Sequence, residues 1–368
     1  MNPTEIAAYY FPNWHPNPRN DKIYGPGESE WVKVREAQPR FSGHNQPKVP
    51  LWGYDDESDP ARMALRIAAA ADHGITAFIF DWYWNEQGPY LERALEQGYL
   101  RAENQNRLKL GIMWANHQPV SRTTFDRAVD HAIETYFGIP AYWRIDGCPY
   151  FSIYELHTLI AGLGGIDATR AALDAMRERV VRAGFPDLHL NAVEWGLHNL
   201  PANTLAPALG LAPEKAFGVQ NTLIERFGIS SVTSYVWVHN VDLPQFPENA
   251  YADVAEAAYA DWDRFHESYP VPYHPNVTMG WDAWPRVPQS QPFEPAQYPR
   301  TPLITKNPPE AFRAALAQAK DWFATREVTQ RVLTLNAWNE WTEGSYLEPD
   351  TEFGFGYLEA IRDVFGRA

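Results

Sequence analysis

The stretch DPARMALRIAAAADHG (59–74), followed directly by ITAFIFDW (75–82), predicts a helix joined to a buried strand. Asp59 is a capping type of residue, and Pro60 fits a first helical turn because its missing N–H would have no partner there. Apolar side chains then recur every three or four residues, and Gly74 ends the pattern. The apolar, β-branched and aromatic run after it is typical of a buried strand.

Similar units extend along the chain. Seven more buried strands are expected at 6–11, 108–114, 150–154, 188–194, 232–238, 277–281 and 332–338. Further helices are expected at 89–102, 124–136, 168–183, 250–266 and 309–325. Alternating strands and helices indicate a parallel sheet, and about eight units predict a single (β/α)8 barrel over 1–368. A doubly wound open sheet is the alternative, but no Gly-x-Gly-x-x-Gly follows the first strand, which disfavours its dinucleotide-binding form.

Two stretches interrupt this alternation. Residues 14–59 follow the first strand, and residues 282–306 follow the seventh. Long loops inside a compact domain are usually functional or mobile. Both would lie at the C-terminal mouth of a barrel, where active sites form.

Composition narrows the function. The 368 residues carry a formal net charge of −15, which argues against nucleic-acid binding. The single cysteine excludes an intrachain disulfide. No apolar run is long enough to cross a bilayer, so membrane insertion is not expected. No signal peptide is visible at the start, which predicts a cytoplasmic protein, or a periplasmic or secreted one if a leader has been removed. The oligomeric state cannot be inferred.

The predicted strand ends repeat one combination: an aromatic ring beside a hydrogen-bonding or ionisable group. Sugars suit such a site because their rings stack on apolar faces while their hydroxyls need partners. We therefore expect sugar contacts from Tyr10, Trp14, Asp81, Tyr83, Trp84, Trp114, Asn116, Tyr154, Glu194, Trp237, His239, Trp281, Asp282, Trp338, Asn339 and Trp341. His and Asp residues among the strand ends lack the local spacing of a metal site.

The segment NAWNEWTEGSYLEPD (336–350) places Glu340 and Glu343 among tryptophans at the last strand end. Two carboxylates beside a glycosidic bond are the usual machinery of its hydrolysis. Residues i and i+3 face opposite sides of a strand but the same side of a helical turn. Both glutamates can therefore face one cavity only if the strand ends near Glu340 and turns at once, as Gly344 permits. Glu348 is expected to anchor the following loop.

Residues 336–350 resemble the signature of the WbsX-like, glycoside hydrolase family 99-like domain. Blocks at 10–15, 25–31, 41–47, 74–84, 114–116 and 280–282 are similar to that family in the same order. The resemblance implies a (β/α)8 barrel that acts on carbohydrate.

Family 99 enzymes are retaining endo-α-mannosidases, and their Glu-Trp-His-Glu motif is similar to Glu340-Trp-Thr-Glu343. The resemblance implies that Glu340 takes the proton of the sugar's 2-hydroxyl and that Glu343 is the general acid/base. The chain departs from the motif at Thr342. It also lacks the family's His-Ile-Glu-Pro-Tyr block, to which Ser152-Ile-Tyr-Glu155 is the nearest match.

Three hypotheses follow. The first is a retaining, mannosidase-like glycoside hydrolase acting on an oligosaccharide or polysaccharide and requiring no cofactor. The second is an enzyme of polysaccharide biosynthesis, either a transferase or a trimming hydrolase. The third is a glycan-binding barrel without catalysis. No basic pocket signature for a nucleotide sugar is visible in the sequence, which disfavours a classical nucleotide-sugar transferase.

Overall fold

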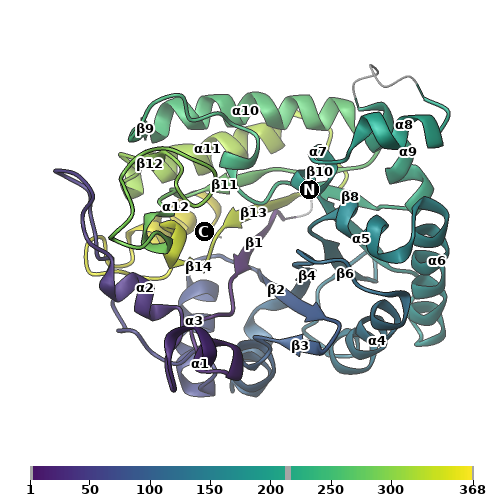
Figure 1. The fold of residues 1–368 in the computed structure, drawn as a ribbon, viewed down its shortest axis with the longest axis horizontal. Helices are drawn as coiled ribbons and strands as arrows, with labels where there is room; N and C mark the ends of the chain where they lie inside the picture. The colour runs from purple at the N-terminus through teal and green to yellow at the C-terminus, as the bar shows by residue number, and fades with distance from the viewer. Residues whose placement is uncertain (1–2, 212–216, 367–368) are drawn as a thin grey trace.

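A computed structural model describes residues 3–211 and 217–366 and has the architecture of a nearly closed parallel barrel surrounded by helices (Figure 1). Neighbouring barrel strands pair in parallel in the order β10-β8-β7-β6-β4-β2-β1-β13-β11. Their bounds are β1 Glu5–Tyr10, β2 Ala77–Asn85, β4 Lys109–Trp114, β6 Cys148–Ile153, β7 His189–Val193, β8 Ser231–Thr233, β10 Tyr273–His274, β11 Asn276–Thr278 and β13 Val332–Asn336. The predicted (β/α)8 barrel is confirmed.

The barrel closes through one interrupted strand. β10 pairs with β8 and β11 pairs with β13, and Pro275 lies between them. Proline has no N–H to donate to a ladder, but its carbonyl oxygen accepts the N–H of Thr334 at 2.9 Å. β10 and β11 together therefore occupy one strand position, the seventh of eight along the chain.

Amphipathic helices cover the outside of the barrel. α3, at Pro60–Asp72, begins as the sequence predicts, because the side chain of Asp59 accepts the N–H of Ala61. Met63 and Ile67 lie on its buried face. The other long helices are α4 Arg122–Ala132, α5 Leu156–Leu163, α6 Ile166–Arg182, α9 Gly218–Phe227, α10 Tyr251–Ser268, α11 Pro309–Thr325 and α12 Gly356–Phe365.

The predicted helix at 89–102 starts later than expected and is not a regular α-helix. The side chain of Asn85 accepts the N–H of Gln87, and Gly88 has a φ of +119°, so the chain turns back on itself. β3 (Gly88–Tyr90) then pairs antiparallel with β2. Helical backbone is confined to a π-turn at Ala94–Gly98 and a 3-10 turn at Tyr99–Arg101.

Two predicted strands are displaced. The strand expected at 232–238 ends its pairing at Thr233, because Trp237 is hydrogen-bonded to β11. The N–H of Trp237 donates to Thr278 Oγ1, and its Nε1 donates to the Asn276 carbonyl. Trp237 then opens a 3-10 turn, Trp237–His239. The strand expected at 277–281 lies earlier, in β10 and β11.

The two long loops contain secondary structure of their own. The first holds α1 (Pro18–Tyr24) and α2 (Trp31–Glu36). The second holds a 3-10 turn, Trp284–Arg286, and β12 (Leu303–Thr305), which pairs with β9 (Glu248–Ala250). The second loop contributes side chains to the cavity described next, and Glu30 of the first loop contacts one of them, Arg286.

Candidate active site

The two glutamates are brought together by an immediate turn after the last barrel strand. β14 (Asn339–Glu340) ends at Glu340, a 3-10 turn runs from Trp341 to Glu343, and β15 (Ser345–Tyr346) returns antiparallel to β14. Gly344 makes this possible: its φ is +62°, and a Cβ there would lie 2.8 Å from the Cβ of Asp282.

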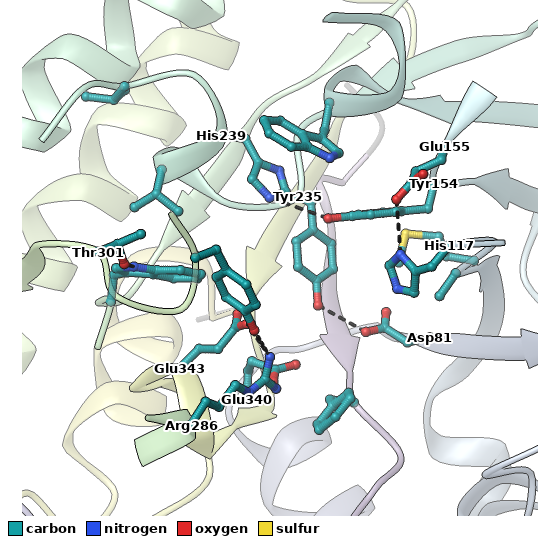
Figure 2. A pocket seen from close by; sticks show the side chains of 18 of the residues that line it. Asp81, His117, Tyr154, Glu155, Tyr235, His239, Arg286, Thr301, Glu340 and Glu343 are labelled. Carbon is teal, nitrogen blue, oxygen red and sulfur yellow. Dashed lines mark hydrogen bonds and ion pairs between the residues drawn. The ribbon is translucent and has the colours of Figure 1, made fainter. Parts of the chain in front are cut away.

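A cavity of about 700 Å³ lies against this turn (Figure 2). Glu340 and Glu343, which we call the carboxylate pair, are 3% and 7% exposed. Aromatic rings and acidic groups dominate the walls. The lining residues are Phe11, Asp81, Tyr83, Met113, Ala115, His117, Tyr154, Glu155, Trp195, Tyr235, Val238, His239, Val241, Asp242, Leu243, Trp281, Arg286, Tyr298, Thr301, Pro302, Glu340 and Glu343.

Arg286 joins the carboxylate pair. Its Nη2 lies 2.6 Å from Glu340 Oε1, its Nη1 lies 2.6 Å from Glu343 Oε1, and its Nε lies 3.3 Å from Glu30 Oε1. The hydroxyl of Tyr298 donates to the same Glu343 oxygen at 2.7 Å. A planar guanidinium suits this arrangement because its fixed donors reach several carboxylates at once.

Burial and the neighbouring cations act in opposite directions on the pKa values of these acids. Burial, and then the neighbouring Glu343, hold the pKa of Glu340 well above its usual value, although Arg286 opposes them. Burial would also raise the pKa of Glu30, but Arg286 and Lys33 bring it below its usual value. These directions favour a proton on Glu340 and ionisation of Glu30, and two adjacent carboxyls of which one holds a proton can supply one acid and one base.

Asp81, in the middle of β2, extends the acidic surface of the cavity. Tyr235 donates to its Oδ2 at 3.0 Å, and its Oδ1 has no hydrogen-bond partner in the described part of the chain. Burial raises the pKa of Asp81 well above its usual value. Figure 2 shows the Tyr235 hydroxyl pointing at Asp81.

Another wall is built from stacked rings. His239 stacks on Trp195 with ring centres 4.3 Å apart, and its Nε2 lies 3.4 Å from the hydroxyl of Tyr154. Burial lowers the pKa of His239 to about 3, so its ring is neutral. Nearby, His117 Nδ1 lies 3.1 Å from Glu155 Oε1. This wall combines flat apolar faces with hydrogen-bonding groups.

The structure brings part of the predicted constellation together. The turn at Glu340–Glu343 has the geometry inferred from their spacing, and both side chains line the cavity. Five of the predicted sugar-contacting residues line it too: Asp81, Tyr83, Tyr154, His239 and Trp281.

Five other predicted polar residues do not line the cavity, and each is hydrogen-bonded to the scaffold, although Oε2 of Glu194 has no partner in the described part of the chain. Asn339 pairs with both backbone groups of Phe11, and Asn116 does the same with Glu155. The five and their partners are Tyr10 with Glu57, Asn116 with Glu155, Glu194 with Tyr269, Asp282 with His44 and Gln46, and Asn339 with Phe11.

Six predicted tryptophans also lie outside the lining, packed within the fold. Trp341 stacks on Tyr346 at 3.7 Å between ring centres and donates to Glu348 Oε2 at 2.8 Å. Burial of so large a ring stabilises the barrel and leaves no face for a ligand. The six are Trp14, Trp84, Trp114, Trp237, Trp338 and Trp341.

The sequence interpretation missed Arg286, Tyr298, Tyr235 and Glu30. Arg286 and Tyr298 come from the loop after β11, and Glu30 comes from the loop after β1. The sequence pointed to Arg286, Tyr298 and Glu30 only indirectly: both long loops were expected at the mouth of the barrel, where active sites form. Tyr235 lies just after β8, which ends at Thr233, whereas the predicted strand continued to residue 238.

Two further observations bear on cofactors and membranes. Within residues 3–211 and 217–366, no three His, Cys, Asp or Glu side chains are grouped as metal ligands would be. In the same ranges, none of the helices combines the length and apolar character needed to span a bilayer.

Two glycoside hydrolases are among the solved structures to which this fold is similar. The GH99 endo-alpha-mannosidase from Bacteroides thetaiotaomicron superposes with a TM-score of 0.60 at 15% identity, covering 98% of this chain and 96% of that one. A beta-glucosidase from Thermotoga maritima gives 0.51 at 11% identity, covering 99% and 98%. The fold therefore defines a (β/α)8 barrel of the kind found in glycoside hydrolases.

The family follows from the sequence. The model described as "Glycosyltransferase WbsX" matches residues 6–128 and 120–361, so the chain belongs to the WbsX family. A relative named "Uncharacterized protein WxcX", from Xanthomonas campestris pv. campestris strain B100, is 26% identical over 383 residues, covering all of this chain. The chain spans about half the length of that relative. The resemblance to the WbsX-like, family 99-like group is confirmed.

Proposed function

We propose that the chain is a glycoside hydrolase that cleaves a glycosidic bond of an oligosaccharide or polysaccharide. The observation that carries this proposal is the carboxylate pair, joined by Arg286 at the wall of an aromatic cavity. Glycoside hydrolysis needs one carboxyl that gives a proton and one that accepts a proton or attacks. A buried pair that retains one proton provides both.

The proposed mechanism assigns a separate role to each glutamate, as the family 99 motif implies. In this mechanism Glu340 starts ionised and Glu343 starts protonated, so the proton that the raised pKa of Glu340 favours there must first pass to Glu343. Glu340 then removes the proton of the 2-hydroxyl, whose oxygen attacks C1, while Glu343 protonates the departing oxygen. Water then loses a proton to Glu343 and attacks C1, and the 2-oxygen regains its proton from Glu340. Configuration at C1 is retained. Because Arg286 and Tyr298 occupy Glu343 Oε1, its Oε2 would exchange the proton.

The charge of the cavity favours hydrolysis over transfer from a sugar nucleotide. Asp81, Glu155, Asp242 and the carboxylate pair line it. Arg286 is the one lysine or arginine among the lining residues described, and it is already bonded to the pair. A diphosphate entering this cavity would meet several acids and no free cation, which would weaken binding.

The test compares wild type with Glu343→Gln and Glu340→Gln on aryl α- and β-glycosides, α-mannan and bacterial polysaccharide fragments. We expect Glu343→Gln to lose about 10²–10⁴-fold in turnover, the usual contribution of general acid–base catalysis, while glycan binding persists. Glu310→Gln, on the exposed side of α11, is the matched control. Release of product that survives both substitutions would contradict the mechanism. Glycan-dependent shifts in melting temperature without product would instead identify a binding protein.

A further inference from the structure

Residues 40–46, which we call the clasp, hold the turn that carries Arg286. The clasp belongs to the loop after β1, whereas the turn Trp284–Arg286 belongs to the loop after β11. None of the clasp residues lines the cavity as described. Contacts between the two loops therefore act on the cavity through Arg286.

The clasp fixes the residues before Arg286 through Asp282. His44 Nε2 lies 2.7 Å from Asp282 Oδ2, and Gln46 Nε2 donates to the same oxygen at 2.6 Å. The other carboxylate oxygen, Oδ1, accepts the N–H of Trp284 at 3.1 Å. Asp282 thus joins the clasp to the first residue of the turn.

The clasp fixes the residues after Arg286 through Arg40. The Arg40 guanidinium donates to four consecutive or near-consecutive carbonyl oxygens and lies 5.3 Å above the ring of Trp284. The acceptors are Val287 at 2.6 Å, Pro288 at 2.9 Å, Gln289 at 3.3 Å and Gln291 at 3.2 Å. One side chain therefore holds the backbone that immediately follows Arg286.

We propose that Arg40 is a positioning residue for the carboxylate pair: by fixing the backbone after Arg286, it keeps that guanidinium bonded to both Glu340 and Glu343. This inference rests on the proposed function for its kinetic consequences. Arg286 must hold two carboxylates at 2.6 Å each, so a small displacement of its backbone breaks at least one contact. Misplacement of a reacting group by about 1 Å costs about 10²-fold in rate.

Displacing the Arg286 guanidinium should change the protonation of the carboxylate pair. The other titratable and charged groups facing Glu340 and Glu343 are Glu30, Asp81, Tyr83, Tyr154, Tyr235 and Tyr298. Arg286 is the cation bonded to both members of the pair. If it moves away, ionising the pair becomes harder, and the acidic limb of the pH–rate profile shifts to higher pH.

The experiment compares Arg40→Ala and Arg40→Lys with Arg300→Ala. Arg300 lies in the loop that carries Arg286, does not itself line the cavity, and pairs with Glu294 at 3.0 Å, so it controls for loss of an arginine ion pair in the loop that Arg40 holds. With the aryl glycoside that wild type cleaves fastest, we expect Arg40→Ala to lower kcat about 10- to 10²-fold with a smaller change in KM. Its acidic limb should move to higher pH. Arg40→Lys should recover part of the loss, and Arg300→Ala should behave as wild type.

A second readout does not need turnover. In protein labelled with ¹³C at glutamate carboxyls, the resonances of the pair should titrate at higher pH in Arg40→Ala than in wild type or Arg300→Ala. A lower melting temperature with an unchanged pH profile and unchanged titration would overturn the positioning role. If wild type cleaves none of the glycosides, the proposed function fails, and the carboxyl titration still decides whether Arg40 positions Arg286.

Discussion

At the scale of single residues, burial decides which carboxyls hold a proton at neutral pH, even outside the cavity. Glu194 opens the short helix α7 (Glu194–His198) and is 1% exposed. Burial raises its pKa to about 7, although the Tyr269 hydroxyl donates to its Oε1 at 3.2 Å and partly opposes the shift.

This shift predicts a pH-dependent stability difference between wild type and Glu194→Gln. Below about pH 4.3, the ordinary glutamate pKa, both states of wild type hold the proton and the difference is constant. As pH rises toward 7, the unfolded chain releases the proton while the native chain keeps it, so wild type loses stability relative to the variant, by about 3 kcal/mol at most. Unfolding in denaturant across this pH range measures it. A difference that does not change with pH would contradict the assignment.

The residue scale also shows how far the sequence could predict the site. Glu340 and Glu343 were found because their spacing and their position after a strand constrain where they face. Arg286 and Tyr298 could not be found in the same way, since each reaches the pair from an irregular loop whose path depends on Arg40 and Asp282. Most of the predicted tryptophans were misplaced because a ring at a strand end serves packing as readily as sugar binding.

At the scale of elements, the loop after β1 is tied to the turn after β13 by a buried ion network. Arg66 of α3 has a side chain 2% exposed; its Nη2 lies 2.5 Å from Asp55 Oδ1 and its Nε lies 2.7 Å from Glu348 Oε1. Glu348 also accepts from Trp341, which lies between the members of the carboxylate pair. Glu348 is therefore a loop anchor, as its position in the sequence suggests.

We expect Arg66→Ala to destabilise the fold strongly, because it leaves the buried Glu348 without its cation and leaves Asp55 with only the exposed Arg62 at 3.7 Å. Removing one partner of a buried pair costs about 3–5 kcal/mol. Arg62→Ala on the same helix is the matched control: its side chain is 48% exposed and lies 3.7 Å from Asp55. Exposed pairs contribute about 0–1 kcal/mol. Denaturant midpoints for the two variants measure the difference, and equal midpoints would contradict the role of Arg66.

Barrel strands were predictable because strands covered on both faces form continuous apolar runs, as 75–82 does. Elements whose ends depend on local polar contacts were not predictable in this way. The hairpin of β2 and β3 depends on the Asn85 side chain, and the early end of β8 depends on the hydrogen bonds of Trp237 to Thr278 and Asn276. Apolar periodicity carries no information on either.

At the scale of the whole molecule, the acidic cavity lies in a chain whose formal net charge is −15. The surrounding acids therefore add to the field of Asp81, Glu155 and Asp242 instead of offsetting it. A neutral glycan meets no electrostatic barrier on entry, whereas an anionic glycan approaches against both the global and the local charge. Charge thus becomes a criterion for substrates of the proposed hydrolase.

We expect a neutral oligosaccharide to bind more tightly than the same oligosaccharide with one ring oxidised at C6 to a uronate. The difference should shrink as salt is added, because screening acts within about 10 Å at 0.1 M ionic strength. Titration calorimetry with Glu343→Gln, which should bind without turnover, measures both affinities at low and high salt. If the uronate binds more tightly, Arg286 must leave the carboxylate pair to meet it, and the cavity would instead select acidic glycans.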